Sequence, residues 1–251
     1  NSSSSSSRTS RIVRMKISPV TVSLTGEYGR RQPHLRCGDY SIEYGSMKSL
    51  FQKFTRTDKE EYITVVSGLP RSGTSMMMKM LEAGGIPPIT DRLREADEDN
   101  PKGYYEFERV KLMDKGDTKW VIEARGTVVK VISALLKHLP PGEMYRVVFV
   151  RRNMPEVLAS QRKMLIRRGE DPDKMDDAQM AMLFGKHLNQ VEEWLDAQPN
   201  FRVLYVHYSD VLADPLPQIA RINDFLGGAL NTRAMAEAVD PNLYRNRQES
   251  R

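Results

Sequence analysis

The sequence predicts an α/β fold of the doubly wound kind, built in three layers from a parallel sheet with helices on both faces. Two observations carry this prediction. Short apolar stretches rich in β-branched residues alternate along the chain with helical stretches, and this order produces parallel strands joined by crossover helices. The apolar stretches also lack the apolar–polar alternation of a strand with one face in water, as expected for strands buried on both faces.

The domain begins with a strand, a turn and a helix. The β-branched run Tyr62–Ser67 predicts a buried strand, and Gly68–Gly73 predicts a turn. Residues Thr74–Ala83 predict a helix, which Gly84-Gly85 ends because glycine readily adopts the backbone conformation that closes helices. Residues 87–103 are rich in Pro, Asp and Glu and therefore predict a surface loop.

The rest of the chain continues the alternation of strands and helices. Proline and glycine mark several boundaries: Pro140-Pro141 end one helix, Pro155 opens the next at its favoured first position, and Gly227-Gly228 close the last. The predicted elements are, in order, strands at Trp120–Ile122 and Thr127–Ile132, a short helix at Ser133–His138, a strand at Tyr145–Val150, a helix from Pro155 to Arg167, a helix at Asp176–Ala197, a strand at Phe201–Val206 and a helix at Ile219–Leu226.

Composition separates a basic N-terminal arm from a domain of balanced charge. Residues 1–60 contain 11 Lys and Arg against 5 Asp and Glu, whereas residues 61–251 contain 27 against 28. The arm opens with a serine run and is too polar to bury a core, while residues 61–251 are long enough for one α/β domain. Because the basic excess lies in the arm, the net charge of +5 does not indicate a nucleic-acid-binding domain.

The single cysteine, Cys37, excludes an intrachain disulfide and favours a reducing, cytoplasmic compartment. His34 and Cys37 form an isolated pair with too few ligands for zinc, so no metal is expected. No apolar run reaches the ~18 residues that a membrane-spanning helix needs. The sequence begins with Asn1 rather than Met, which leaves a preceding signal or anchor as an open alternative.

The strongest functional signal is the turn Gly68-Leu-Pro-Arg-Ser-Gly73 between the first strand and the first helix. Such a turn points successive backbone N–H groups at one place, beside the positive end of the helix dipole, and this geometry binds phosphate. The two glycines have the spacing of a Walker A loop, but Thr74 stands where that loop has its lysine. The cation here is Arg71, within the turn, which favours a donor with one 5′-phosphate and a transferable group over ATP. The alternative is an ordinary turn with an exposed arginine.

A second anion site is predicted where the strand Tyr145–Val150 meets the helix that follows it. Arg152 follows this strand, and ligands of doubly wound sheets bind at the carboxyl ends of the strands. Ser160 lies on the helix, about one and a half turns after Pro155. An arginine fork and a hydroxyl together suit a phosphate. The alternative is an arginine that is solvated or paired with Glu156.

These residues resemble the sulfotransferase family. Pro70–Ser75 is similar to its 5′-phosphosulfate loop, P-[KR]-S-G-[TS]-[TS], and Arg152–Ser160 to its 3′-phosphate motif, R-N-P-x-D-x-x-x-S, with Met154-Pro155 in place of the motif's proline. Leu204–Pro215 and the following Ile219–Gly227 resemble the stretch L-x-Y-E-D-L-x-x-D-P…I-x-x-F-L-G. The similarity covers residues 61–227 in order, and it implies a P-loop-like sulfotransferase fold and the donor 3′-phosphoadenosine 5′-phosphosulfate (PAPS).

The resemblance implies how this donor would bind. Its 5′-phosphosulfate would be held by Arg71 and by the backbone of the next four residues, which are Ser72, Gly73, Thr74 and Ser75. Its 3′-phosphate would be held by Arg152 and Ser160, and its adenine would lie near Tyr208. The family's C-terminal R-K-G segment has no clear match, so Arg245 and Arg247 are candidate substitutes.

Catalysis requires cations for the leaving phosphate and a base for the acceptor proton. Arg71 supplies one cation, and Lys130, at the end of a predicted strand, is similar to a family lysine that steadies the bridging oxygen. Ile132 occupies the position where cytosolic members have a basic histidine. Other members use a glutamate soon after the first helix, which favours Glu106 between two aromatic residues. Two further candidates are Glu95, ranked second, and His138, for which the end of a helix is the simpler interpretation.

The acceptor is expected to be a small molecule or a glycan with a hydroxyl or amine. Met164, Met175, Met180 and Met182 flank one loop and are candidates for an adaptable acceptor wall. Three other functions stay open: a P-loop kinase or NTPase, a non-catalytic nucleotide-binding protein of the same fold, and a polyanion-binding module that uses the basic arm. The sequence does not indicate an oligomeric state.

Overall fold

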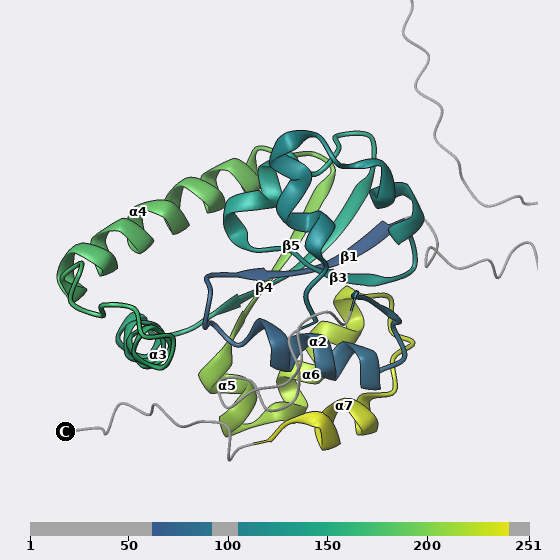
Figure 1. Cartoon of the computed structure of the whole chain (residues 1–251). Helices are drawn as coiled ribbons and strands as arrows, with labels where there is room; N and C mark the ends of the chain where they lie inside the picture. The colour runs from purple at the N-terminus through teal and green to yellow at the C-terminus, as the bar shows by residue number, and fades with distance from the viewer. Residues whose placement is uncertain (1–61, 92–104, 241–251) are drawn as a thin grey trace, which may run out of the picture. The chain divides into compact units, whose positions relative to one another are not determined.

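The computed structural model describes residues 62–91 and 105–240, which contain a five-stranded, all-parallel sheet (Figure 1). The strands are β1 (Tyr62–Gly68), β2 (Pro88–Ile89), β3 (Val128–Lys130), β4 (Met144–Arg151) and β5 (Phe201–His207). Five positions discussed above lie outside the described residues, as does the arm of residues 1–60: His34, Cys37, Glu95, Arg245 and Arg247.

The strand order β2-β3-β1-β4-β5 makes β1 the central strand. β2 and β3 lie on one side of β1, and β4 and β5, which follow in the chain, lie on the other side. The direction in which successive strands are added therefore reverses at β1. The register pairs Val66 with Lys130 and Gly68 with Val150, which brings the carboxyl ends of β1, β3 and β4 to the same edge. This reversal point is where doubly wound sheets bind ligands.

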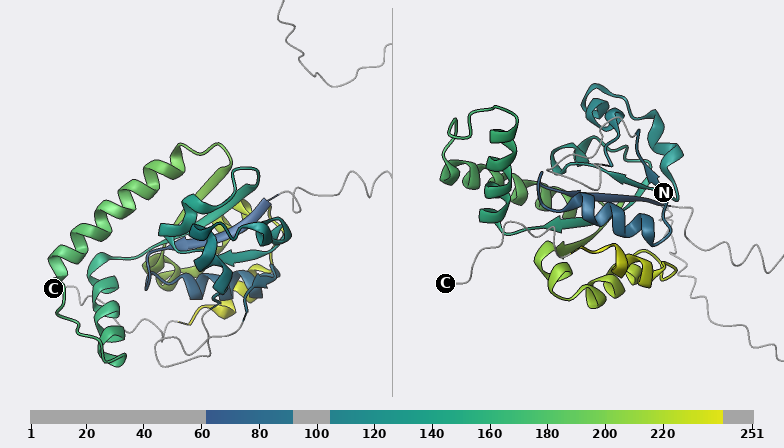
Figure 2. Two further views of the ribbon diagram at one scale, coloured as in Figure 1. Left: turned by 45° about the horizontal axis from the view of Figure 1, so that its top comes forward. Right: turned by 60° about the horizontal axis from the view of Figure 1, so that its bottom comes forward.

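Helices cover both faces of the sheet, as the sequence predicted (Figures 1 and 2). One face is covered by α2 (Thr74–Ala83), α5 (Tyr208–Ala213), α6 (Pro215–Phe225) and α7 (Thr232–Ala238). The other is covered by three 3₁₀ helices, η2 (Glu108–Lys115), η3 (Lys119–Ala124) and η4 (Ser133–His138), and by the C-terminal part of α4 (Asp177–Asp196). The remaining helix, α3 (Met154–Arg167), follows β4.

Alternating side chains of β1 divide the core in two. Tyr62 and Val66 pack into the cluster beneath α2, whereas Ile63 and Val65 pack into the cluster beneath η2 and η4. Every residue of β1 is buried. A strand buried on both faces favours apolar residues at successive positions, and β1 is mostly apolar, with Thr64 and Ser67 as its buried polar residues.

The structure contradicts some predicted boundaries. Trp120–Ile122 is not a strand but part of η3, where the Trp120 ring packs edge-on against Phe107 at 5.1 Å between centroids. The predicted loop 87–103 contains the short strand β2, which pairs with β3. Helix α6 starts at Pro215 rather than Ile219, because proline suits the first turn of a helix. The helices α5 and α7 were not predicted.

Gly68→Ala is expected to lower the free energy of unfolding by about 1–3 kcal/mol. A Cβ at Gly68 would lie 2.5 Å from the carbonyl oxygen of Val150, and the backbone has a φ of +150° there. Gly142→Ala is the matched control, since nothing lies within 4 Å of its Cβ position. Chemical denaturation measures both variants, and equal stabilities would contradict this account of the β1–β4 contact.

Candidate active site

The turn between β1 and α2 is shaped by three residues with positive φ: Gly68 at 150°, Arg71 at 69° and Gly73 at 103°. The Ser72 N–H donates to the Leu69 carbonyl at 3.2 Å and closes the turn. Gly73 then provides the N-cap of α2, with no side-chain cap, and no residue in the first turn of α2 is acidic. The first N–H groups of a helix have no partner within it, so Thr74 and Ser75 present theirs where an anion is favoured.

Tyr208, the first residue of α5, packs directly on this turn. A Cβ at Gly73 would lie 2.3 Å from Cδ2 of the Tyr208 ring, so glycine is required there for space as well as for its positive φ. Burial raises the pKa of the Tyr208 phenol and keeps it neutral, although the positive charge of Arg152 opposes this shift. The ring therefore forms a neutral, aromatic wall beside the phosphate loop.

The two predicted anion sites adjoin each other in the structure. Nε of Arg71 donates to Oγ of Ser160 at 2.9 Å, and Nη1 of Arg152 donates to the carbonyl oxygen of Arg71 at 3.1 Å. These contacts join the phosphate loop to Arg152, between β4 and α3, and to Ser160 in the middle of α3. Three of the predicted donor-binding side chains thus lie in one cluster.

Arg152 is also paired with Glu156, which is the alternative that the sequence left open. Its Nε donates to Oε2 of Glu156 at 2.9 Å, and both side chains are almost fully buried. The guanidinium carbon lies 4.6 Å from the centre of the Tyr208 ring. The pairing does not remove Arg152 from the site. It fixes the guanidinium between the phosphate loop and Tyr208, because a buried cation needs a counter-charge.

One buried polar atom in the loop tests whether the site suits an anionic ligand. Ser72 is buried, and its Oγ has no hydrogen-bond partner among the described residues. A buried hydroxyl without a partner costs about 1–3 kcal/mol. An oxygen of a bound phosphate or sulfate would satisfy it, so the loop fits the phosphosulfate group that the family resemblance implies.

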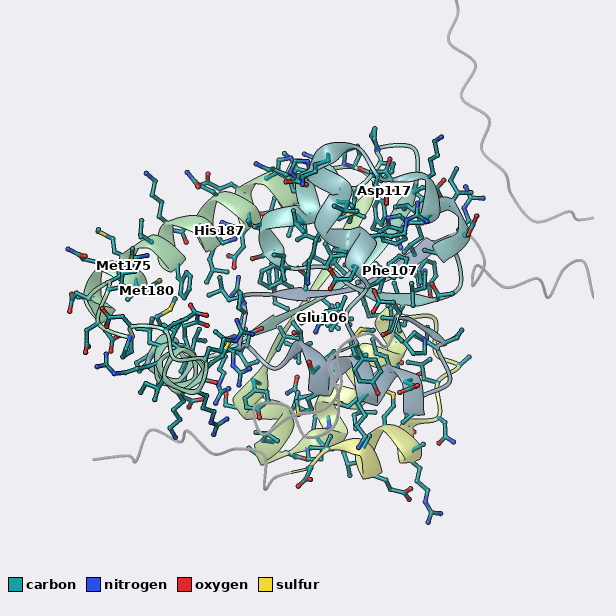
Figure 3. The ribbon with its side chains drawn as sticks, in the orientation of Figure 1. Glu106, Phe107, Asp117, Met175, Met180 and His187 are labelled. Carbon is teal, nitrogen blue, oxygen red and sulfur yellow. The ribbon has the colours of Figure 1, made fainter. Side chains whose placement is uncertain are left out.

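Lys130, the last residue of β3, lies close to Glu106, whose position is labelled in Figure 3. Nζ of Lys130 lies 4.0 Å from Oε1 of Glu106, and Nζ of Lys111 lies 3.6 Å from the other carboxylate oxygen. The Glu106 backbone is held at the end of β2, because its carbonyl accepts hydrogen bonds from Thr90 Oγ1 at 2.9 Å and from the Asp91 N–H at 3.3 Å. The two predicted catalytic residues are therefore neighbours.

His187 on α4 is a residue that the sequence analysis missed. Its Nε2 lies 2.8 Å from Oγ of Ser133, the buried first residue of η4. Burial lowers the pKa of His187, and the nearby Lys137 adds to this effect. His138, by contrast, is the last residue of η4, and Ile132 is exposed. No local motif marks His187, because it meets Ser133 only through the packing of α4 on η4.

Two further features of residues 62–91 and 105–240 bear on other functions. Among these residues, no group of three or more His, Cys, Asp or Glu side chains is placed to bind a metal ion. Over the same ranges, no helix has both the length and the apolar character needed to cross a bilayer.

Comparisons with known proteins identify the family. The sequence model of the sulfotransferase domain matches residues 63–250, so the chain belongs to the sulfotransferase domain family. Three solved structures resemble it. The sulfotransferase domain from the curacin biosynthetic pathway is 16% identical, with coverage of 75% of this chain and 78% of that chain and a TM-score of 0.42. The sulfotransferase domain from the Synechococcus PCC 7002 olefin synthase is 18% identical, with coverage of 76% and 85% and a TM-score of 0.43. The sulfotransferase from Alicyclobacillus acidocaldarius is 15% identical, with coverage of 72% and 87% and a TM-score of 0.43.

Glu156→Gln is expected to lower the free energy of unfolding by about 3 kcal/mol, because it removes the buried carboxylate that pairs with the Arg152 guanidinium. Glu237→Gln is the matched control: Glu237 also pairs with an arginine four residues away, but both side chains are exposed. That pair contributes at most ~0.5 kcal/mol. Denaturation curves measure the free energy of unfolding of both variants. A Glu156→Gln variant as stable as the Glu237→Gln control would refute the role of the buried pair.

Proposed function

We propose that this protein transfers a sulfuryl group from PAPS to a hydroxyl or amine of a small-molecule or glycan acceptor. The observation that carries the proposal is the contact between the two anion sites, with Arg71 Nε 2.9 Å from Ser160 Oγ. A ligand with one anion at the 5′ position and another at the 3′ position of one ribose needs two such sites side by side. ATP carries phosphates only at the 5′ position and would not use the second site.

Each predicted binding residue has a role in this proposal. Arg71 and the backbone of residues 72–75 bind the 5′-phosphosulfate, and Ser72 Oγ gains the partner that it lacks within the described residues. Arg152 and Ser160 bind the 3′-phosphate, to which Arg152 brings a guanidinium already oriented by Glu156. Tyr208 contributes an aromatic surface for the adenine. The absence of a Walker lysine at Thr74 further disfavours the kinase alternative.

The transfer step is an in-line displacement at sulfur. The acceptor oxygen or nitrogen forms a bond to sulfur while the bond from sulfur to the bridging oxygen breaks, and 3′-phosphoadenosine 5′-phosphate leaves with the electron pair. Arg71 and Lys130 stabilise the negative charge that develops on the leaving phosphate. Their two cations supply the charge for which phosphoryl-transfer enzymes use Mg²⁺.

Glu106 is the proposed general base, which takes the proton that the acceptor loses. Its carboxylate lies 4.0 Å from the Lys130 ammonium, so base and charge stabiliser share one end of β3. Such a position matches the needs of the reaction, because the acceptor atom, which loses its proton to the base, and the leaving oxygen flank the same sulfur. Rigid anchoring of the Glu106 backbone at the end of β2 limits the entropy lost on alignment.

The bisphosphate product should stabilise the protein more than ATP–Mg²⁺ does, because only the product fills both anion sites. At 100 times its dissociation constant it adds about 2.7 kcal/mol to the free energy of unfolding. Ser160→Ala should weaken this effect, whereas Ser209→Ala, on α5, should not. Thermal-shift titrations measure the stabilisation by each ligand in the wild type and in both variants. Stronger stabilisation of the wild type by ATP–Mg²⁺ than by the bisphosphate product would favour the kinase interpretation.

Glu106→Gln should reduce sulfuryl transfer by about 10²–10⁴-fold and leave binding of the bisphosphate product intact, because the amide cannot accept the proton. Glu108→Gln, two residues away and exposed, is the control and should retain activity. The assay follows radiolabelled sulfuryl transfer from PAPS to a panel of phenols, alcohols, amines and glycans. Wild-type protein that binds the product but sulfates nothing in the panel would support the non-catalytic alternative. Equal rates for wild type and Glu106→Gln would remove Glu106 from the mechanism.

A further inference from the structure

Ser133 and His187 form a second polar pair close to the carboxyl end of β3. Ser133 is buried and follows Lys130, the last residue of β3, by three positions. The Val131 N–H still donates to the Val66 carbonyl of β1 at 3.0 Å, so the chain leaves the sheet just before Ser133. Nε2 of His187, on α4 (Figure 3), lies 2.8 Å from Oγ of Ser133. The pair therefore brings an imidazole from α4 to the segment that begins with the proposed catalytic lysine.

The contact with Ser133 uses only one nitrogen of the imidazole. Ser133 is the one hydrogen-bond partner of His187 among the described residues, and it faces Nε2, which leaves Nδ1 available to a ligand. His187 is partly exposed. Burial and the positive charge of Lys137 both lower its pKa, which keeps the imidazole neutral near neutral pH. The Ser133 hydroxyl can donate or accept, so Nδ1 of the neutral ring can be an acceptor or a donor toward the ligand.

Other contacts already hold α4 on the sheet. Leu195 is buried in the last turn of α4, and Leu188 packs against the same core cluster. Oε2 of Glu192 also pairs with Nη2 of Arg151, at the end of β4, at 2.6 Å. A helix docked by an apolar face and an ion pair gains little from one more neutral hydrogen bond. The imidazole of His187 is therefore better explained by binding than by packing.

The short distance from the proposed catalytic residues suits a small acceptor. Three residues of extended chain span at most ~10 Å, which bounds the separation of the Cα atoms of Lys130 and Ser133. Nζ of Lys130 in turn lies 4.0 Å from Oε1 of the proposed base, Glu106. An acceptor whose reacting group lies beside Glu106 can thus carry a second polar group that reaches His187.

We propose that Nδ1 of His187 binds a second polar group of the acceptor and orients the acceptor for attack on sulfur. This role rests on the proposed function and specifies its acceptor class. The acceptor carries a hydrogen-bonding group in addition to the hydroxyl or amine that is sulfated. Such a contact selects against analogues that lack the second group, because the imidazole nitrogen would then lose water without gaining a partner.

Two substitutions of His187 separate acceptor binding from the contact with Ser133. The amide of glutamine places a polar atom near the position of Nε2, whereas the shorter asparagine places one near Nδ1. His187→Gln should therefore keep the contact with Ser133 and lose the contact with the acceptor. His187→Asn should do the reverse. His138→Gln, at the end of η4, is the matched control.

Sulfuryl transfer from PAPS is measured with pairs of acceptors that differ by one hydroxyl: phenol against catechol, resorcinol and hydroquinone, and a simple alcohol against diols. For the preferred dihydroxy compound, kcat/KM per reacting hydroxyl should be about 10-fold higher in the wild type, which is the value of one hydrogen bond. This preference should vanish in His187→Gln and persist in His187→Asn and His138→Gln. Thermal melts and binding of the bisphosphate product show whether each variant is folded with an intact donor site.

The outcomes distinguish this role from a structural one and from failure of the proposed function. A His187→Gln variant that keeps the preference would overturn the role and leave His187 as a partner of Ser133 alone. A wild type with no preference would overturn it as well, and loss of the preference in both His187→Gln and His187→Asn would overturn the assignment to Nδ1. A wild type that binds the bisphosphate product but sulfates no acceptor would contradict the proposed function, and this role with it.

Discussion

The buried guanidinium of Arg152 is the constraint on which the site depends. A cation removed from water must have its donors satisfied, and Arg152 meets this need with Glu156 on one side and the Arg71 carbonyl on the other. Because the second partner is a backbone group in the phosphate loop, the loop conformation and the position of α3 are fixed together. Arg71, held at a positive φ of 69°, then reaches Ser160 on the same helix.

Parallel strand topology explains why separate stretches of sequence meet at this place. The central strand β1 ends at the phosphate loop, and its neighbours β3 and β4 end at Lys130 and Arg151. All strands of this sheet run in the same direction, so each motif that follows a strand lies at the edge formed by the carboxyl ends of the strands. The apolar core on both faces of β1 holds these ends in register, which links the mostly apolar sequence of the strands to the geometry of the site.

Sequence patterns predicted the long elements and failed on short ones. β1, β4 and β5 are seven or eight residues long and mostly apolar, and α2, α3 and α4 have clear proline, glycine or N-cap boundaries. A three-residue apolar run such as Trp120–Ile122 cannot distinguish a strand from a turn of 3₁₀ helix. In the structure these residues belong to the 3₁₀ helix η3, and the Trp120 ring packs against Phe107. The two-residue strand β2 forms only because β3 provides an edge to pair with.

The sequence by itself determined the chemistry of the candidate site: a glycine-rich turn with one arginine, a second arginine after a buried strand, and a serine on the following helix. These are local patterns, set by backbone conformation and by the residue types that bind anions. Only the tertiary structure decided the contacts between distant residues, such as Arg71 with Ser160, Lys130 with Glu106 and Ser133 with His187. Such contacts depend on how helices and strands far apart in the chain pack together, and no short stretch of sequence contains that information.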